Sequence, residues 1–226
     1  MQCLFEIIIC STHTYFFASF IEANLLRNHI GECKLEIEIE FKNTLNKEQF
    51  ERLLTFYNVE PAQIKRQVNY YFDTDTWALK NKKSALRVRQ IDRYYECTIK
   101  EATSTNTSFE TTDILSEVQA ANLIEHLNFP QGNVHSRLNE LQIPTGSLVL
   151  FGKLTTDRVE IPFKGGLLVF DHSFYLQQDD YEVEYETNDE RKGLGIFEEF
   201  LNLHHIPKQD APKKIARFMN ALQQKG

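Results

Sequence analysis

The chain has 226 residues, 42% of them hydrophobic, and is therefore long enough to bury the core of one generous domain or of two small ones. Its 25 Lys and Arg are outnumbered by 32 Asp and Glu, which gives a formal net charge of −7 and disfavours a generally basic nucleic-acid surface or a polybasic membrane patch. Nine Gly and six Pro are too few for a collagenous chain, and 17 Phe with nine Tyr argue against disorder.

The cysteines and the start of the chain bear on where the protein is located. The cysteines, at spacings of 7, 23 and 64 residues, match no zinc-ligand pattern and do not resemble a compact disulfide framework: Cys3, Cys10, Cys33 and Cys97. Polar residues, among them Glu6 and Glu22, interrupt the early apolar runs, which fall short of the roughly 20 residues that a membrane helix needs. A secretory signal would require a positive charge near its start, but no Lys or Arg precedes Arg27. We expect a cytoplasmic protein with reduced thiols.

Residues 1–34 differ from the rest of the chain. They carry few charges and three of the four cysteines, and they show no clear helical or strand period. Because interpretable patterns begin near Lys34 or Leu35, we expect the natural chain to begin there, with 1–34 an extension from a mis-assigned start. The alternative is an additional docking strand or helix. No linker or fixed-period repeat divides the remainder, so residues 35–226 are predicted to form a single domain.

The first half of this domain reads as a strand, a helix and then more strands. The region from Lys34 to Lys42 alternates strictly between charged and apolar residues, which predicts a β-strand with one charged face. Asn46, followed three residues later by Gln49, has the spacing of a capping box and begins a predicted helix over 46–58. The next predicted strands cover 67–74, 85–91, 94–101 and 109–115, with a polar loop over 102–108.

The second half contains helices on either side of further strands. Helical patterns over 116–128 and 134–141 are interpreted as a cap or an insertion. Strands resume over 148–163, 167–176 and 181–187, and predicted helices over 189–204 and 211–224 end the chain. Short alternating strands joined by tight turns indicate an antiparallel meander, so the predicted fold class is α+β.

Almost every predicted strand has ionic residues on one face and apolar residues on the other. The ionic positions are Glu36, Glu38, Glu40, Lys42, Arg87, Arg89, Lys100, Glu110, Arg158, Asp171, Glu182, Glu184 and Glu186. On a single strand such a face is most simply the solvated side of a sheet. Carboxylates at i, i+2 and i+4, about 7 Å apart, nevertheless repel one another unless cations lie among them. The joint pattern therefore favours the lumen of a closed barrel of some eight strands, with helices on the outside.

Such a lumen would contain an acidic part and a basic part. Carboxylates suit a hard divalent cation such as Mg²⁺ or Mn²⁺, which prefers oxygen ligands. Arginine presents a bidentate fork to phosphate oxygens, so Arg87, Arg89 and Arg158 suit a chain of phosphates. A metal ion with a triphosphate is the simplest ligand that satisfies both parts.

These residues also carry a resemblance. Glu38-Ile39-Glu40-Phe41-Lys42 matches the ExExK motif of the CYTH superfamily, also called triphosphate tunnel metalloenzymes. Further matches follow in the family's order: Tyr71-Phe72-Asp73-Thr74, Arg87-Val88-Arg89, Thr98-Ile99-Lys100, Arg158, Asp171, Glu182-Val183-Glu184 and Lys214. The resemblance covers about residues 35–220 and is greatest to the small bacterial CYTH proteins of the Gram-positive type.

The resemblance implies a closed eight-stranded antiparallel tunnel with helices packed outside, a divalent metal, Mg²⁺ or Mn²⁺, and chemistry at a triphosphate. It implies metal ligands at Glu38, Glu40, Asp171, Glu182 and Glu184, and phosphate contacts at Lys42, Arg87, Arg89, Lys100, Arg158 and Lys214. The ExExK residues Glu38, Glu40 and Lys42 are the implied catalytic group. Glu36 and Glu186 extend the acidic rows, and Glu110 is either a metal ligand or the partner of an arginine.

The leading hypothesis for function is metal-dependent hydrolysis of tripolyphosphate, thiamine triphosphate or a nucleoside triphosphate. Two alternatives remain, an adenylate cyclase of the class IV type that uses the same tunnel, and a non-catalytic polyphosphate or nucleotide sensor. Removal of RNA 5′-triphosphates is less attractive because of the net charge of −7. The expected partner is a small-molecule triphosphate, with no nucleic acid or membrane, and the expected state is a monomer or homodimer.

Other patterns are interpreted as structural. Gly152-Lys153 lacks the upstream glycine and the following Ser or Thr of a P-loop. His172 and the pair His204-His205 lack the spacing of a closed metal site, so a surface or capping role is expected. Aromatic side chains in β-rich segments are usually core residues rather than platforms for a base or thiazole ring, and we expect this of Tyr70, Tyr71, Phe72 and Trp77.

Overall fold

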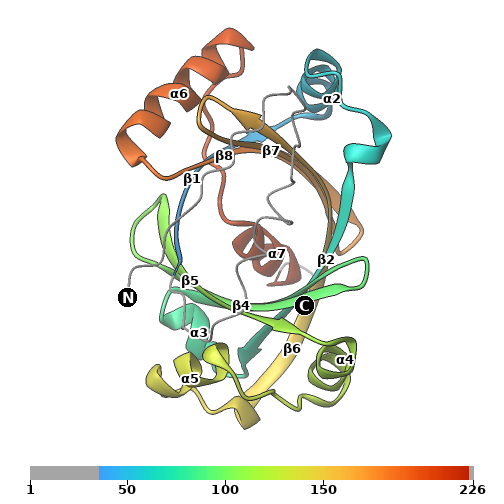
Figure 1. The fold of residues 1–226 in the computed structure, drawn as a ribbon, viewed down its shortest axis with the longest axis vertical. Helices are drawn as coiled ribbons and strands as arrows, with labels where there is room; N and C mark the ends of the chain where they lie inside the picture. Colours follow the sequence, from blue (N-terminus) through green and yellow to red (C-terminus); the bar gives the residue numbers. More distant parts are fainter. Residues whose placement is uncertain (1–35, 224–226) are drawn as a thin grey trace, which may run out of the picture. The chain divides into compact units, whose positions relative to one another are not determined.

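The computed structural model describes residues 36–223, and this part of the chain forms a closed antiparallel barrel (Figure 1). The predicted extension over 1–34 and the first two residues of the predicted first strand lie outside the described residues. The strands are β1 (Glu36–Leu45), β2 (Lys65–Thr74), β3 (Ser84–Ile91), β4 (Tyr94–Ala102), β5 (Thr107–Leu115), β6 (Leu148–Phe163), β7 (Gly166–Tyr175) and β8 (Gln178–Thr187). Their order around the barrel is β1-β5-β4-β3-β2-β6-β7-β8, which confirms the predicted fold class.

Helices surround this barrel. They are α2 (Lys47–Phe56), α3 (Ala78–Asn81), α4 (Glu117–His126), α5 (Asn133–Glu140), α6 (Glu190–Leu203) and α7 (Lys214–Gln223), with short 3₁₀ turns η1 (Pro61–Gln63) and η2 (Thr145–Ser147). Within residues 36–223, no helix is both long and apolar enough to cross a membrane.

Two apolar clusters on the outer face hold the helices against the strands. Around β1, β7 and β8, Phe41, Phe170 and Val183 pack with Phe197 and Phe200 of α6. On the opposite side, Val88 of β3 and Ile99 of β4 pack with Leu123 of α4 and Leu138 of α5. Because side chains alternate along a strand, burying these residues outside turns their ionic neighbours into the lumen.

Helix α7 lies across one end of the barrel, where Figure 1 shows it within the ring of strands. Phe218 of α7 packs with Tyr71, Leu154 and Tyr175. Its ring also lies against Gly152 of β6, where a Cβ atom would stand only 2.1 Å from Phe218 Cζ. Gly152 therefore allows close packing of the helix, in agreement with the rejection of a P-loop.

Most predicted elements are present, with differences at their ends. Asn46 and Gln49 form the expected reciprocal cap of α2. Strand β5 begins at Thr107, so the predicted polar loop is shorter than expected. Helices α4 and α5 are an insertion between β5 and β6 that packs on the outer face (Figure 1). Helix α3 was not predicted because one turn is too short to show a helical period.

Candidate functional site

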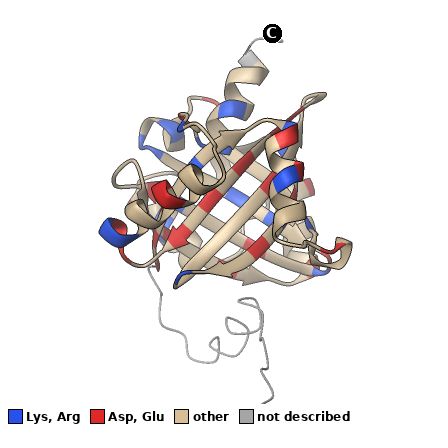
Figure 2. Cartoon of the chain, turned by 90° about the horizontal axis from the view of Figure 1, so that it is seen from above, with Lys and Arg blue, Asp and Glu red and all other residues tan. Residues whose placement is uncertain are grey.

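The lumen gathers the charged residues that the strand alternation predicts, and Figure 2 shows acidic and basic positions following the strands of the barrel. The register places lumen residues of neighbouring strands side by side. Lys42 of β1 lies opposite Glu184 of β8, and Arg158 of β6 lies opposite Asp171 of β7. Lys100 of β4 lies opposite Glu110 of β5.

A compact carboxylate cluster occupies the β7–β8 wall. Asp171, Glu182 and Glu184 each offer an oxygen atom, and these atoms lie within 4.8 Å of one another. Asp171 and Glu182 are direct partners across the two strands. All three residues are buried, with exposed fractions of 0%, 0% and 2%. Three converging buried carboxylates match the donor set that a hard divalent cation prefers.

Four basic side chains of the described residues contact this carboxylate cluster, and two of them, Arg158 and Lys214, reach more than one of its members. Arg158 donates two hydrogen bonds to Asp171, at 2.8 and 2.6 Å, and one to Glu184 at 2.8 Å. Lys214 of α7 contacts Glu182 and lies 2.7 Å from Asp171 and 2.9 Å from Glu184. These cations neutralise carboxylates that would otherwise be buried without partners.

The ExExK residues of β1 connect the cluster with the opposite wall. Lys42 lies 3.1 Å from both Glu40 and Glu184. Lys100 contacts Glu38 and lies 3.4 Å from Glu40 and 3.2 Å from Glu110. Glu38 and Glu40 thus face the same lumen as the carboxylate cluster, but they contact lysines, and Ser108 also donates to Glu38 at 3.3 Å. Glu110, left open between two roles, pairs with Lys100.

Burial and neighbouring charge shift the pKa values of these carboxyl groups in opposite directions. Burial alone would raise the pKa of Glu184, but the charges of Lys42 and Arg158 hold it down at about 2. Burial raises the pKa of Glu186 to about 7, with Arg158 opposing and Glu184 and Glu160 adding to the rise. Glu184 therefore remains ionised at neutral pH, whereas Glu186 is close to its midpoint.

The β3 arginines have fewer acidic contacts. Arg89 donates to Asn69 at 2.9 Å and lies 3.5 Å from Glu96. Burial and the adjacent Arg87 lower the pKa of Arg89 to about 10. The Nε atom of Arg87 is buried and, within residues 36–223, has no hydrogen-bond partner. Two half-buried arginines, neither of them closer than 3.5 Å to a carboxylate within the described residues, are suited to an anion.

Two basic residues near the tunnel end were not among the predicted site residues, Arg217 of α7 and Lys213, which directly precedes α7. Arg217 lies 2.7 Å from Glu182 and 2.8 Å from Asp180. Lys213 is half-buried next to Lys214. The helical spacing of i and i+3 between Lys214 and Arg217 was available in the sequence, but nothing there showed that this helix covers the tunnel.

Most residues that were interpreted as structural lie on the outer face, whereas Tyr71 is a lumen-side neighbour of Arg87. His204 is buried on the outer face, with its ring 4.8 Å from that of Phe200. His172 lies 2.7 Å from Asp179. Trp77 packs edge-on against Phe151, and Tyr71 and Phe72 are buried.

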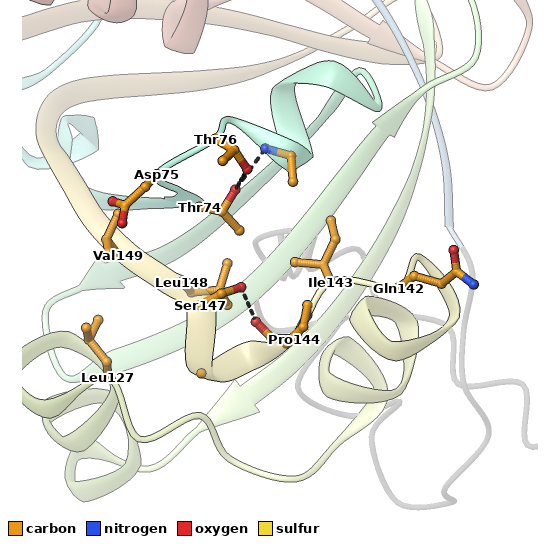
Figure 3. Close-up of a pocket in the computed structure, with 12 residues that line it drawn as sticks. Thr74, Asp75, Thr76, Leu127, Gln142, Ile143, Pro144, Ser147, Leu148 and Val149 are labelled. Atoms are coloured by element: carbon orange, nitrogen blue, oxygen red, sulfur yellow. Dashed lines mark hydrogen bonds between the residues drawn. The ribbon is translucent and has the colours of Figure 1, made fainter.

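A separate pocket of about 470 Å³ lies where β2 ends and β6 begins (Figure 3). Thr74, Ile143 and Leu148 are among its lining residues, and Asp75 is the charged one. Because no Lys or Arg lines it within the described residues, this pocket does not suit a polyanion.

Comparison with known proteins is consistent with this geometry. The family model named CYTH domain matches residues 36–219, so the chain belongs to the CYTH domain family. A relative from Bacillus subtilis (strain 168), named "Putative triphosphatase YjbK", is 40% identical over 183 residues, which cover 81% of this chain and 94% of the relative.

Two solved structures share the fold. A crystal structure of a "putative adenylate cyclase" from Bacillus halodurans is 38% identical, with a TM-score of 0.78, and the match covers 81% of this chain and 98% of that chain. HpAC1 from Hippeastrum, described as a "putative adenylyl cyclase" with a dominant triphosphatase activity, is 24% identical, with a TM-score of 0.66, and the match covers 82% of this chain and 95% of that chain. At that identity the second likeness concerns the fold alone.

Proposed function

We propose that this protein is a divalent-metal-dependent hydrolase of a triphosphate bound in the barrel lumen. The observation that carries the proposal is a lumen that holds both a buried three-carboxylate cluster and two arginines of β3 without a close ion pair within the described residues. The name of the Bacillus subtilis relative supports the same activity. The candidate substrates are inorganic tripolyphosphate, thiamine triphosphate and nucleoside triphosphates.

The residues present fit a metal ion, because the converging side chains offer only carboxylate oxygens. We propose that Asp171, Glu182 and Glu184 hold it, with Glu38 and Glu40 contributing from β1. When bound, a divalent ion polarises phosphate oxygens and lowers the pKa of a water molecule. Carboxylate donors favour Mg²⁺ or Mn²⁺ over softer metals.

The basic residues of the lumen would orient the substrate. Arg87 and Arg89 can bind phosphate oxygens without first giving up a tight ion pair, because Arg87 has no acidic contact within 4 Å in the described part of the chain and Arg89 has a loose one. Lys42, Lys100, Arg158 and Lys214 would balance the remaining charge. Positioning and charge stabilisation are the main requirements of phosphoryl transfer.

Attack by water requires no nucleophile from the protein. Cys97 is buried among outer-face residues next to Val88 and Leu123, and burial raises the pKa of its thiol. A buried thiol with a raised pKa is unreactive. A covalent phosphocysteine step is therefore not part of the proposal.

Phosphate release tests the proposal directly. Purified protein is incubated with tripolyphosphate, thiamine triphosphate, ATP or GTP in Mg²⁺, Mn²⁺ or chelator, and orthophosphate and pyrophosphate are measured. We expect metal-dependent orthophosphate release that falls on the order of 100-fold or more in Glu38→Gln/Glu40→Gln. The matched control is Glu48→Gln/Glu51→Gln, which removes the same charge from the exposed surface of α2. No turnover in any condition would overturn the enzyme assignment and leave a binding protein.

The same assay distinguishes a cyclase. The solved relative from Bacillus halodurans is named for that activity, which is why the alternative is kept. A cyclase would release pyrophosphate from ATP together with a cyclic nucleotide, and it would not act on tripolyphosphate.

We also propose the finer properties that the sequence analysis predicts. They are Mg²⁺ or Mn²⁺ as the ion, a single domain over residues 35–226, a cytoplasmic location, a monomer or homodimer, and no nucleic-acid or membrane partner. Intact mass of the protein from its native locus, fractionation of those cells and light scattering of purified protein test the start, the location and the oligomeric state.

A further inference from the structure

Asn69 of β2 is a buried polar residue that the proposed mechanism does not use. Its exposed fraction is 2%, and it lies directly opposite Arg89 of β3 and Leu154 of β6. The residues that alternate with this pair, Tyr70 and Val88, pack in the outer-face cluster, so Asn69 and Arg89 face the lumen. Asparagine is depleted in strands, and burying an amide is unfavourable unless it is hydrogen-bonded.

The amide of Asn69 fixes the guanidinium group of Arg89. Arg89 donates from Nε to Oδ1 of Asn69 at 2.9 Å. On the other side of Arg89, the carboxylate of Glu96 lies 3.5 Å from Nη1. The first distance is typical of an N–H···O hydrogen bond, and the second is longer than one. Arg89 is therefore oriented mainly by a neutral group.

Other arginines of the described chain are held by carboxylates instead. Four of them donate from Nε and Nη2 to the two oxygens of one carboxylate, at 2.6–3.0 Å: Arg66 to Asp157, Arg137 to Glu101, Arg158 to Asp171 and Arg217 to Asp180. Such a bidentate pair fixes the guanidinium group and at the same time neutralises it. Among residues 36–223, Arg89 is the arginine whose Nε donates to an amide.

An amide and a carboxylate have nearly the same shape but differ in charge and in hydrogen bonding. Asn69 accepts through Oδ1 only, because its Nδ2 is a donor. Nη2 of Arg89 therefore finds no acceptor on Asn69, and the positive charge is not cancelled there. Burial and the charge of Arg87 lower the pKa of Arg89 to about 10, which leaves the guanidinium group protonated at neutral pH. Asn69 thus holds an arginine in place and leaves its charge for another ligand.

We propose that Asn69 is a positioning residue for substrate binding, which orients Arg89 through Nε without neutralising it and so leaves Nη2 to a phosphate group. This inference rests on the proposed triphosphate site, in which Arg89 is one of the phosphate contacts. A carboxylate at position 69 would accept from Nε in the same way, but it would also pair with Nη2 and compete with the phosphate. Asn69 itself need not touch the substrate.

Adding the missing charge tests this role. Asn69→Asp keeps the shape and the acceptor for Nε, and the affinity for inorganic tripolyphosphate is measured by calorimetry in chelator. We expect about tenfold weaker binding together with an equal or higher Tm, because Arg89 gains a bidentate partner. An asparagine that is merely structural would lose stability and affinity together. The matched control Asn122→Asp adds the same charge to the exposed face of α4 and should change neither.

A double-mutant cycle tests whether Asn69 acts through Arg89. Asn69→Ala should weaken tripolyphosphate binding about threefold in the wild-type background, because Arg89 loses its anchor, and should have no further effect in Arg89→Met. A thermal melt checks that each variant is folded. Equal weakening in both backgrounds, or unchanged affinity in a folded Asn69→Asp, would overturn the inference and leave the triphosphatase intact. If wild type binds tripolyphosphate but hydrolyses nothing, the proposed function fails, and the cycle still decides the role of Asn69.

Discussion

Arg158 and Arg87 face the same lumen from different walls, and their surroundings differ. Arg158, on β6, donates three hydrogen bonds to the buried carboxylates of Asp171 and Glu184. Arg87, on β3, is half-buried, and its buried Nε atom has no hydrogen-bond partner within the described residues. Arg158 makes close ion pairs with buried carboxylates, whereas Arg87 has Glu110 only as a more distant charged neighbour, which raises its pKa without a contact within 4 Å among the described residues.

The difference separates stabilisation from ligand binding. An arginine that is already paired stabilises the fold, and its removal takes one of the cations away from buried carboxylates. An arginine without partners adds little to the free energy of unfolding, and its charge is available for an anion. We therefore expect substitutions of the two arginines to differ in their effect on the free energy of unfolding, although both should reduce activity.

The largest expected effect comes from removing each arginine in turn. Arg158→Met should lower the free energy of unfolding by about 3 kcal/mol, because Asp171 and Glu184 lose their guanidinium partner. Arg87→Met should change it by less than about 1 kcal/mol, since Arg87 is half-buried and makes no ion pair within 4 Å among the described residues. Urea denaturation in chelator measures both, and both variants should lose triphosphate turnover. Equal destabilisation by the two substitutions would contradict the contrast between the walls.

A smaller effect is expected where the carboxylate wall meets α7. Lys214 and a divalent ion need the same oxygens of Asp171, Glu182 and Glu184. Removing the amine in Lys214→Met should therefore tighten Mn²⁺ binding about tenfold, equal to about 1.4 kcal/mol, in the absence of triphosphate. Free Mn²⁺ measured by electron paramagnetic resonance reports the affinity, with Lys208→Met as a control of equal charge. Weaker Mn²⁺ binding in Lys214→Met would mean that the lysine supports the metal site instead of competing for it.

The smallest expected effect concerns His204, which lies on the outer face of the barrel and not among the charged residues of the lumen. Burial lowers the pKa of His204, and the charge of Arg52 adds to this. A histidine with a depressed pKa in the folded state stabilises the protein above its unfolded pKa, near 6.5, and that contribution is lost as pH falls through the folded pKa. His204→Phe should therefore show a smaller drop in Tm, by a few degrees, between pH 7.5 and 5.5. An identical pH profile in wild type and His204→Phe would assign the acid sensitivity to the lumen.

Much of the fold was predictable because the two faces of each strand have different chemistry. Phe170 and His172 lie outside while Asp171 lies inside, as a two-residue period requires. The positions of Glu38, Glu40 and Lys42 followed from the same alternation. The structure confirms these orientations, and the metal-binding and phosphate-binding roles stay predictions.

What the sequence could not predict depends on which segments meet in space. The period of α7 is that of any amphipathic helix, so neither its place across the barrel end nor the contacts of Arg217 could be deduced. Asp73 accepts hydrogen bonds from the amides of Leu79 and Lys80 and thereby caps α3. That helix is too short to be seen as a pattern. The stagger of the strands decides which lumen side chains lie close together. A short stretch of sequence does not contain that information.

Closure of the barrel has a consequence for how the chain folds. Strand β1 pairs on one side with β5 and on the other with β8, so Phe41 meets Tyr185 only after nearly the whole described chain has been made. Contacts between such distant segments form slowly. During synthesis, the edge of β1 therefore stays unpaired until β8 has been made, and an unpaired strand edge can pair with another chain and aggregate. Glu36, Glu38 and Glu40 place repelling charges along that edge, so the glutamates of the lumen also protect the unfinished protein.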